Sequence, residues 1–377
     1  SDMLSGLRSD KSDLSGQVDA LTARNEQLTG QLDAADRFLA GSAGRVPPPV
    51  GAPGGRGPGP ALALAGAASI LIGAHALSPD QAIAAFTDFT GSDTDRIVRY
   101  IRLPRTVAGV LAGLAFALAG AIMQGLTRNP LAGPGLLGIN AGASLAIVLA
   151  MGGLGVASAS GYVWFAFLGA AVAAVFVYTL GSLGFGGATP VKLALAGAAF
   201  AALCGAITTA ITLLDRTTFE NFRFWVVGSL ARADTESVWG VAPFIVLGAV
   251  LAFSVARSLN AIAMGDDMAR TLGTRLGAVR AVGALSVVLL AGGAVAIAGP
   301  LAFLGLVVPH LARFCAGQDY RWLLVWSAVF GPTLLLLADI LGRVIARPME
   351  IQVGVVTAFA GAPFFLYLVR NRRVATL

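Results

Sequence analysis

The stretch TVAGVLAGLAFALAGAIMQGL, residues 106–126, decides the fold of this chain. It contains no charged side chain, and arginines stand close to both of its ends, at Arg105 and Arg128. An apolar helix of about 20 residues is long enough to cross the hydrocarbon core of a lipid bilayer. We therefore predict a membrane-spanning helix near residues 104–126.

Comparable apolar segments fill the chain on both sides of this stretch, from Ala61 to Leu368. Glycine and proline interrupt some of them, notably at Gly299-Pro300 and Pro309-His310, and such breaks are tolerated where neighbouring helices satisfy the freed backbone groups. The predicted fold class is an all-α polytopic membrane protein with about ten transmembrane helices. We place them near residues 61–77, 104–126, 135–153, 161–181, 191–214, 236–257, 278–299, 301–315, 321–341 and 350–369.

The composition agrees with a membrane protein. Hydrophobic residues make up 56% of the chain and charged residues 12%, whereas soluble domains average about 25% charged residues. The net charge is +6 and is carried mostly by arginine. Because these arginines do not gather on a soluble segment, we expect no nucleic-acid partner and attribute the positive balance to cytoplasmic loops.

Residues that could hold a metal or perform bond chemistry are scarce. Cys204 and Cys315 lie in apolar segments, and His75 and His310 have no carboxylate or cysteine at ligand spacing. We expect neither a disulfide nor a metal site. No Gly-Lys-Ser or Gly-Lys-Thr phosphate loop is present, so any nucleotide that drives the protein binds elsewhere. An intramembrane enzyme is disfavoured because no Ser-His pair or facing aspartate pair stands out.

The first 60 residues differ in kind from the rest. Leucines recur every seven residues at Leu7, Leu14, Leu21 and Leu28, which predicts a coiled-coil-like helix over residues 1–40. Residues 41–60 are rich in proline and glycine and form a linker. We expect the helix to be a fused or dispensable addition, or an interaction module, and we expect no cleavable signal peptide. The transmembrane domain then covers residues 61–373.

The loop arginines predict the orientation in the membrane. With the N-terminus inside, the inner segments contain Arg128, Lys192, Arg257, Arg270, Arg275, Arg280, Arg313, Arg321, Arg370, Arg372 and Arg373. The outer segments contain Arg96, Arg99, Arg102, Arg105, Arg216, Arg223, Arg232, Arg343 and Arg347. Positive charge is thus biased inward, and the outer arginines that run against the bias are candidates for a function.

Three blocks of motifs, in order along the chain, resemble one family of transporters. They are Arg102-Leu-Pro-Arg105 with Arg128-Asn-Pro-Leu131 and Gly135-Leu-Leu-Gly138; Phe303-Leu-Gly-Leu306 with Pro309-His310-Leu-Ala-Arg313; and Ala338-Asp-Ile-Leu-Gly-Arg343 with Gly361-Ala-Pro363. Through them, residues 61–373 are similar to the permease subunit of iron-siderophore and vitamin B12 ABC importers. Within that family, Phe222-Arg-Phe-Trp225 followed by Gly228-Ser-Leu230 looks most like the ferric-enterobactin permease.

The resemblance implies a type II ABC importer permease architecture, with ten helices in each of two permease subunits. We expect the second subunit to be a paralogue, so that the pair is a heterodimer. Two cytoplasmic ATPase subunits would bind ATP and Mg²⁺, and this chain itself would bind no cofactor and no metal. A substrate-binding protein outside the membrane would deliver a ferric siderophore.

The resemblance also assigns a docking role to three outer arginines, Arg102, Arg105 and Arg343. In the family, arginines at these positions receive glutamates of the binding protein, and a guanidinium holds a carboxylate through two parallel hydrogen bonds. The alternative is that these arginines reach lipid phosphates or cap helix ends. Asp339 stands four residues before Arg343, a spacing that suits an ion pair within one helix; a proton-relay role for Asp339 is a further alternative.

A second site is implied between the sixth and seventh spans, on the inner side. There the family carries a coupling element that sits in a cleft of the ATPase, and we expect two short helical turns separated by Gly273. Met268 and Leu272 would form its apolar contact face. A polar rim would come from Asp266, Asp267, Arg270 and Arg275.

Two motifs predict helix breaks near the inner side, Asn129-Pro130 and Pro309-His310. His310 is a candidate for a pH-sensitive gate, although a histidine at a break more often caps the broken helix. On the outer side, the aromatic cluster of Phe219, Phe222, Phe224 and Trp225 would form an interfacial belt or line the way in for an aromatic ligand.

The sequence thus predicts the permease subunit of a ferric-siderophore ABC importer, a multi-pass protein of the plasma (inner) membrane that is surrounded by lipid and performs no bond chemistry. A haem or vitamin B12 permease of the same family remains an alternative. So does an ion-coupled secondary transporter, which would need buried acids as coupling sites. Asp339 is nearly alone as an acid within the predicted spans.

Overall fold

The chain divides into two units, Ser1–Pro53 and Gly54–Leu377. The computed structural model describes Thr22 and Glu26 of the first unit, both helical and exposed, and residues 59–73, 77–156, 158–183 and 190–370 of the second. The predicted coiled-coil-like helix and nearly all of the linker lie outside the described residues. The domain boundaries at residues 40 and 60 therefore stay predictions.

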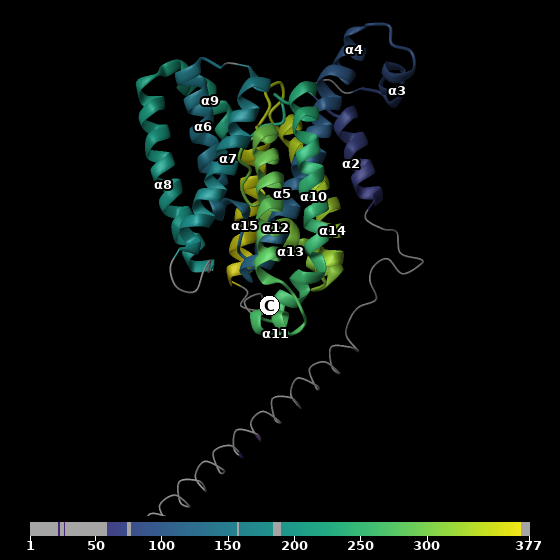
Figure 1. The fold of residues 1–377 in the computed structure, drawn as a ribbon. Helices are drawn as coiled ribbons and strands as arrows, with labels where there is room; N and C mark the ends of the chain where they lie inside the picture. Colours follow the sequence, from purple (N-terminus) through teal and green to yellow (C-terminus); the bar gives the residue numbers. More distant parts are fainter. Residues whose placement is uncertain are drawn as a thin grey trace, which may run out of the picture. The chain divides into compact units, whose positions relative to one another are not determined.

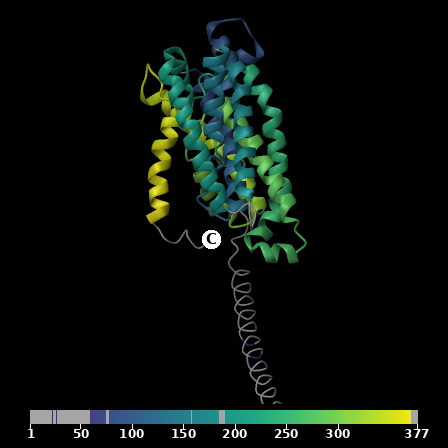
Figure 2. The same cartoon turned by 60° about the vertical axis from the view of Figure 1, so that its left-hand side comes forward.

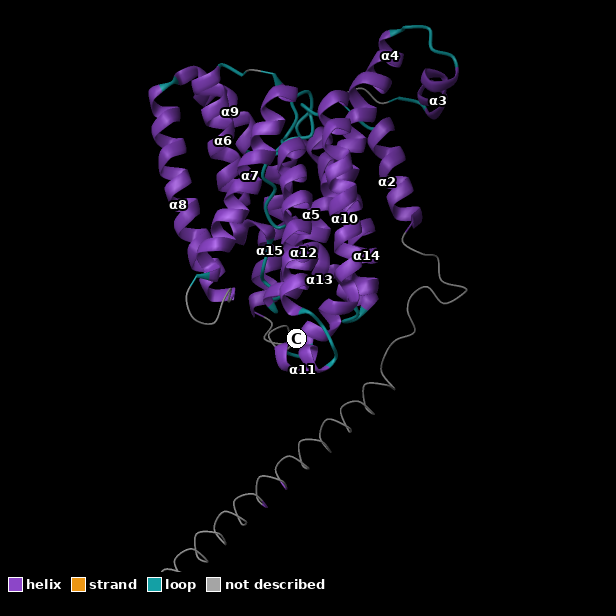
Figure 3. Ribbon diagram, in the orientation of Figure 1, coloured by secondary structure: helices purple, strands orange, loops and turns teal. Residues whose placement is uncertain are grey.

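The described part of the second unit consists of helices and connecting loops (Figure 3). Its long helices are α5 (Leu103–Thr127), α7 (Ala159–Ser182), α8 (Pro190–Leu214), α10 (Thr235–Ala263), α12 (Leu276–Ala298) and α14 (Tyr320–Ile345). Four shorter apolar helices are α2 (Gly59–Leu71), α6 (Ile139–Leu154), α13 (Leu304–Ala316) and α15 (Val353–Arg370). Short connecting elements are α3 (Pro79–Thr87), α4 (Asp93–Arg96), the π-helix η1 (Ile97–Arg102), the 3₁₀-helix η2 (Pro134–Leu137), α9 (Arg216–Val226) and α11 (Asp266–Thr271).

The predicted all-α membrane fold is confirmed. Among the described residues, 6 helices are long and apolar enough to cross a membrane, and each of the remaining predicted spans contains one of the four shorter apolar helices. The third span is shorter than predicted, because η2 and a left-handed turn at Gly138, with φ of 68°, precede the start of α6. A left-handed backbone at this position interrupts the helix and suits glycine.

One predicted helix break is wrong and another is confirmed. Pro309 lies inside α13, and the helix continues through Pro309-His310. Pro309 is the sixth of the 13 residues of α13 and removes one backbone hydrogen bond inside the helix. Such a loss is tolerated in membrane helices where neighbouring groups satisfy the freed carbonyl. The predicted break at Gly299-Pro300 is confirmed, because the chain leaves the helical conformation between α12 and α13, where Gly299 and Phe303 adopt positive φ angles of 74° and 64°.

Helix α5 is the centre of the bundle. It packs against α10, α12, α13 and α14, and 78% of its apolar window is buried. Glycines allow backbone-to-backbone contact at two levels. Gly113 of α5 meets Gly331 of α14, and Gly120 of α5 meets Gly305 of α13, so closely that an added Cβ would collide with backbone atoms. Small residues at such contacts are how helices pack in membranes.

The two ends of the bundle carry different connections. Figures 1 and 2 show α11 at one end, beside the ends of α10 and α12, and α3 and α4 at the opposite end. We call the end with α11 the inner end and the other the outer end, following the orientation that the arginines predict. Both predicted sites can now be located, because the docking arginines lie at the outer end and the coupling element lies at the inner end.

Candidate functional site

The structure brings Arg102, Arg105 and Arg343 together at the outer end, but it buries all three. Their exposed fractions are 6%, 7% and 2%. The expectation that their side chains project from the outer face toward a partner is therefore wrong for this conformation. The three guanidinium groups bind groups of their own chain instead.

Arg105 and Arg343 share one carboxylate. Arg105 donates to both oxygens of Asp339, at 2.8 Å from Nη2 and 3.0 Å from Nε, and Arg343 Nη2 lies 2.9 Å from Asp339 Oδ2. The predicted ion pair between Asp339 and Arg343 is thus confirmed. Arg105 Nη1 also lies 2.8 Å from Glu350, an acid that the sequence interpretation missed. Arginine suits this arrangement because its fork can serve two carboxylates at once.

Arg102 and Arg343 also cap the C-terminal end of α2. Arg102 Nη1 donates to the carbonyls of Ile70 and Leu71 at 2.6 and 2.9 Å. Arg343 Nη1 donates to the carbonyls of Ser69 and Ile72, both at 2.9 Å. The last carbonyls of a helix lack partners within the helix and carry partial negative charge. The outer arginines therefore hold the end of α2 against α5 and α14, which is the helix-capping alternative.

Local sequence explains how Arg102 and Arg105 reach these partners. The π-helix η1 runs directly into α5, with the Leu103 N–H bonded to the Val98 carbonyl. The irregular register suits Pro104, which has no N–H to contribute. Arg102 and Arg105 stand on either side of Leu103 and Pro104 and so project toward α2 and α14 rather than along the helix axis.

At the inner end, α11 presents the predicted apolar face. Met268 and Leu272 are 48% and 61% exposed, while Ala269 is fully buried against the bundle. Gly273 ends the element with a φ of 79°, and Arg275 is exposed. The second predicted helical turn is absent from this described segment, because the chain passes from Gly273 directly to the start of α12.

The two acids of α11 behave differently. Asp267 points outward and pairs only with Arg270 on the same helix, at 3.1 Å. Asp266 points into the protein, where its Oδ2 accepts from Arg280 of α12 at 2.8 Å and its Oδ1 lies 3.7 Å from Arg128 at the end of α5. We call Asp266, Arg128 and Arg280 the inner clasp. The expectation that Asp266 belongs to an outward polar rim is wrong, because its carboxylate faces its own chain.

Asn129-Pro130 forms the predicted helix end. Arg128 adopts a left-handed conformation with φ of 49°, and the Asn129 side chain accepts from the Leu131 N–H at 2.9 Å. His310, by contrast, is buried within α13 and its Nδ1 lies 2.8 Å from the Leu306 carbonyl, one turn earlier. It does not cap a break, and its gating role stays a prediction.

The aromatic cluster of α9 divides into two pairs. Phe219 and Phe224 are 47% and 40% exposed, as an interfacial belt requires. Phe222 and Trp225 are buried, and their rings stack with centroids 6.0 Å apart. Among the described residues, no group of three or more His, Cys, Asp or Glu side chains could hold a metal ion.

A bundle of apolar helices whose central helix carries no charged side chain between Arg105 and its end at Thr127, with ion-pair networks at its two ends, defines a multi-pass membrane protein. The sequence profile of the FecCD transport family matches residues 61–371. This chain belongs to that family.

Individual relatives agree along most of their length. The ferric enterobactin transport system permease protein FepD of Escherichia coli is 46% identical over 82% of this chain and 93% of its own. The probable siderophore transport system permease protein YfiZ of Bacillus subtilis is 44% identical over the same shares. A solved metal-chelate type ABC transporter in an inward-facing conformation has a TM-score of 0.73 and 26% identity, covering 83% of this chain and 97% of its own.

Sequence interpretation missed the partners that complete both networks. Glu350 lies beyond α14, far from Arg105 along the chain, and carried no local signal. Arg128 directly precedes the predicted helix end, and Arg280 falls one turn into α12. Arg280 lies 14 residues after Asp266, so its positive charge was the available signal for the inner clasp, whereas Arg128 comes from a distant part of the chain and carried none.

Proposed function

We infer that this chain is the membrane-spanning permease subunit of an ATP-driven importer, and we propose that its cargo is a ferric siderophore. The observation that carries the proposal is the similarity, along nearly the whole transmembrane domain, to two proteins named as siderophore and ferric enterobactin permeases. We place the chain in the plasma membrane. A second candidate cargo is haem, because the hemin transport system permease protein HmuU of Yersinia pestis is 39% identical over 72% of this chain.

Power is proposed to come from two cytoplasmic ATPase subunits that bind ATP and Mg²⁺, with no cofactor on this chain. Exposed Met268 and Leu272 support this proposal, since large apolar side chains on a short connecting helix suit a cleft in another protein. The inner clasp can transmit a movement of the ATPase contact into the bundle. Through Asp266 it ties α11 to the ends of α5 and α12, so a displacement of α11 is transmitted to the most buried helices of the bundle.

A second permease subunit is proposed to pack near α8. Only 17% of the apolar window of α8 is buried, against 78% for α5. Small exposed residues, Ala198, Ala202, Gly205 and Thr209, follow one another at helical spacing along α8, and such stripes favour close helix packing in membranes. We propose a paralogous partner, giving a heterodimer, because the chain resembles the ferric enterobactin permease.

A binding protein is proposed to deliver the cargo at the outer end. The docking role of Arg102, Arg105 and Arg343 stays a prediction. A carboxylate from outside would have to compete with Asp339, Glu350 and the carbonyls of α2 for guanidinium groups that are already engaged.

Reconstitution tests the proposed function. The chain is incorporated into lipid vesicles with its partner permease and ATPases, and a loaded binding protein is added outside. We expect a ferric siderophore to accumulate only when ATP and an active ATPase are present, and accumulation to persist after an uncoupler is added. Accumulation by the chain alone, or its loss on uncoupling, would instead favour an ion-coupled transporter. Competition by haem would identify the second candidate cargo.

A further inference from the structure

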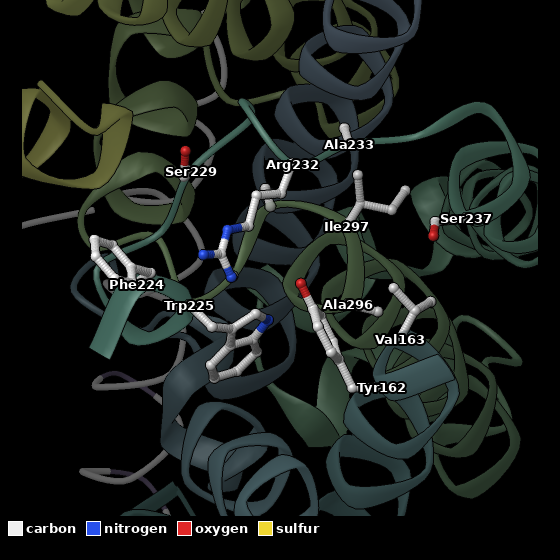
Figure 4. A pocket seen from close by; sticks show the side chains of 12 residues that line it. Tyr162, Val163, Phe224, Trp225, Ser229, Arg232, Ala233, Ser237, Ala296 and Ile297 are labelled. Atoms are coloured by element: carbon white, nitrogen blue, oxygen red, sulfur yellow. The ribbon is translucent and has the colours of Figure 1, made fainter. Parts of the chain in front are cut away.

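A small cavity at the outer end lies where five parts of the chain meet. It is surrounded by the start of α7, the end of α9, the segment that joins α9 to α10, the start of α10 and the end of α12 (Figure 4). Its free volume is about 20 Å³, which is room for roughly one water-sized group. Tyr162, Trp225, Arg232 and Ser237 provide its polar side chains.

Two of these side chains are buried donors without a partner among the described residues. Trp225 is 5% exposed and Ser237 is 6% exposed, and neither the indole Nε1 nor the hydroxyl forms a hydrogen bond. An indole nitrogen can only donate, and leaving a buried donor unpaired costs free energy. The Trp225 Nε1 is directed toward the space that Tyr162 and Arg232 also face (Figure 4).

Among the described side chains that line this cavity, Arg232 carries the one charge. The Arg232 guanidinium interacts with the Tyr162 hydroxyl and lies 5.3 Å from the ring centroid of Phe224. None of the described residues that line the cavity is an aspartate or glutamate. The carboxylate of Asp234 lies outside this lining but acts electrostatically on the Tyr162 hydroxyl, and its Oδ1 accepts from the backbone N–H of Ser237 at 2.7 Å. A lining of donors and a cation, with no acid of its own, favours an acceptor that carries negative charge.

We propose that this cavity is an outer subsite that accepts an anionic oxygen of the transported ferric chelate. The proposal rests on the proposed function. The oxygens that coordinate Fe(III) in a chelate carry negative charge, and one such group fills a space of this size. Arg232 and Phe224 are exposed at the mouth, so the guanidinium can move to admit the group while the aromatic ring covers its flank.

The substitution Trp225→Phe tests the subsite, since it keeps an aromatic ring and removes only the N–H. Because that buried N–H has no protein partner, its loss should not lower the melting temperature of the complex. In vesicles containing the complete importer, with binding protein loaded with a ferric tricatecholate, we expect the chelate transported per ATP hydrolysed to fall about ten-fold. The binding-protein concentration that gives half the maximal rate should not change, because docking is intact.

Two further variants complete the design. Arg232→Gln removes the cation at an exposed residue, should lower transport in the same way, and replaces Trp225→Phe if that variant does not assemble. Trp239→Phe is the matched control, because Trp239 also lies at the outer end of α10, is 65% exposed and does not line the cavity. It should transport like the unmodified importer.

A second probe, ferric citrate, identifies the oxygen. If the variants transport less of both chelates per ATP hydrolysed, the subsite accepts any anionic oxygen. If they transport less of the tricatecholate alone, the subsite accepts a catecholate oxygen. Unchanged transport in Trp225→Phe and Arg232→Gln would mean that the cavity holds only water, and a lowered melting temperature with normal transport would make Trp225 structural; either result overturns the subsite. An unmodified importer that moves neither probe overturns the proposed function itself.

Discussion

The outer arginine cluster and the inner clasp use the same chemistry in different surroundings. In the outer cluster, the side chains of Arg105 and Asp339 are 9% and 2% exposed. In the clasp, those of Arg280 and Asp266 are 30% and 27% exposed. A buried pair cannot open without leaving a charge in a medium of low dielectric constant, whereas a partly exposed pair is rehydrated when it opens. The comparison indicates that the outer cluster is a fixed anchor and that the clasp can open and close during transport.

The largest expected effect comes from removing the carboxylate of the anchor. Asp339→Ala leaves Arg105 and Arg343 buried without their shared acid, which should cost about 3–5 kcal/mol of folding stability. Thermal unfolding of the purified protein measures it. Asp267→Ala is the control, because Asp267 also pairs with an arginine but its side chain is 98% exposed. Similar losses in the two variants would contradict the distinction between anchor and exposed pair.

The second effect separates anchoring from docking at Arg102. Arg102→Ala leaves the carbonyls of Ile70 and Leu71 without their guanidinium partner, which should cost about 1–3 kcal/mol locally. Faster hydrogen exchange across α2, measured by mass spectrometry, would report the lost anchor. Arg96→Ala is the control, because Arg96 is the exposed last residue of α4 and directly precedes the π-helix η1.

Capture of the loaded binding protein by the same Arg102→Ala variant tests the docking prediction. Weakened capture with unchanged exchange in α2 would support docking and contradict the anchor. If the docking prediction holds, the double charge reversal Arg102→Glu with Arg105→Glu should abolish capture and leave ATPase binding intact. Because both residues are buried, that variant should lose stability as well, which makes it a poor measure of docking.

The third effect lies in the clasp. Asp266→Asn removes the charge that joins α11 to Arg280 and Arg128, so the ATPases should still bind and hydrolyse ATP while less chelate moves per ATP. For partly exposed pairs we expect a coupling energy of about 0.5–1 kcal/mol between Asp266→Asn and Arg280→Gln in a double-mutant cycle, a two- to five-fold change. Asp267→Asn is the matched control and should leave this ratio unchanged. Additive effects of the two clasp substitutions would show that the residues do not act together.

Sequence alone predicted the helices well and the partners of their charged residues poorly. A long uncharged apolar segment such as residues 106–126 is stable only inside a bilayer or a protein core, and there it must form a helix. Its secondary structure therefore follows from local composition. The pair of Asp339 and Arg343 was equally local, since helical geometry brings residues four apart together.

Contacts between distant parts of the chain could not be read in the same way. Tyr100 and Ile101, directly before Arg102, are exposed. The guanidinium of Arg102 nevertheless reaches carbonyls at the end of α2. Pro309 suggested a break, but its cost depends on the packing of α13 rather than on the residue itself. Family resemblance placed Asp266 in the coupling element, and only the fold shows that its carboxylate faces Arg280.

The smallest expected effect concerns a third carboxylate, Asp319, which caps α14 at the inner end. Its Oδ1 accepts from the Asn260 side chain of α10 at 2.8 Å and from the Arg321 N–H at 2.9 Å. Partial burial alone would raise the pKa of Asp319, but the hydrogen bonds from Arg321 and Asn260 outweigh it and hold the pKa below its ordinary value. The ionised carboxylate therefore joins α10 to α14.

The sign of the pH dependence follows from that lowered pKa. A carboxyl group with a depressed pKa in the folded state contributes stability above its unfolded pKa of about 3.9, and this contribution is lost as the pH falls through the folded value. Asp319→Asn can still cap the helix but lacks the charge, so the unmodified protein should melt slightly higher at about pH 6, and this difference in melting temperature should narrow as the pH falls below about 4. Asp215→Asn is the informative comparison, because the pKa of Asp215 is also lowered, chiefly by the Thr218 hydroxyl, but its bonds stay within the first turn of α9. If both variants lowered the global melting temperature equally, the connection between α10 and α14 would add nothing to stability. Helix capping alone would then account for the stabilisation by Asp319.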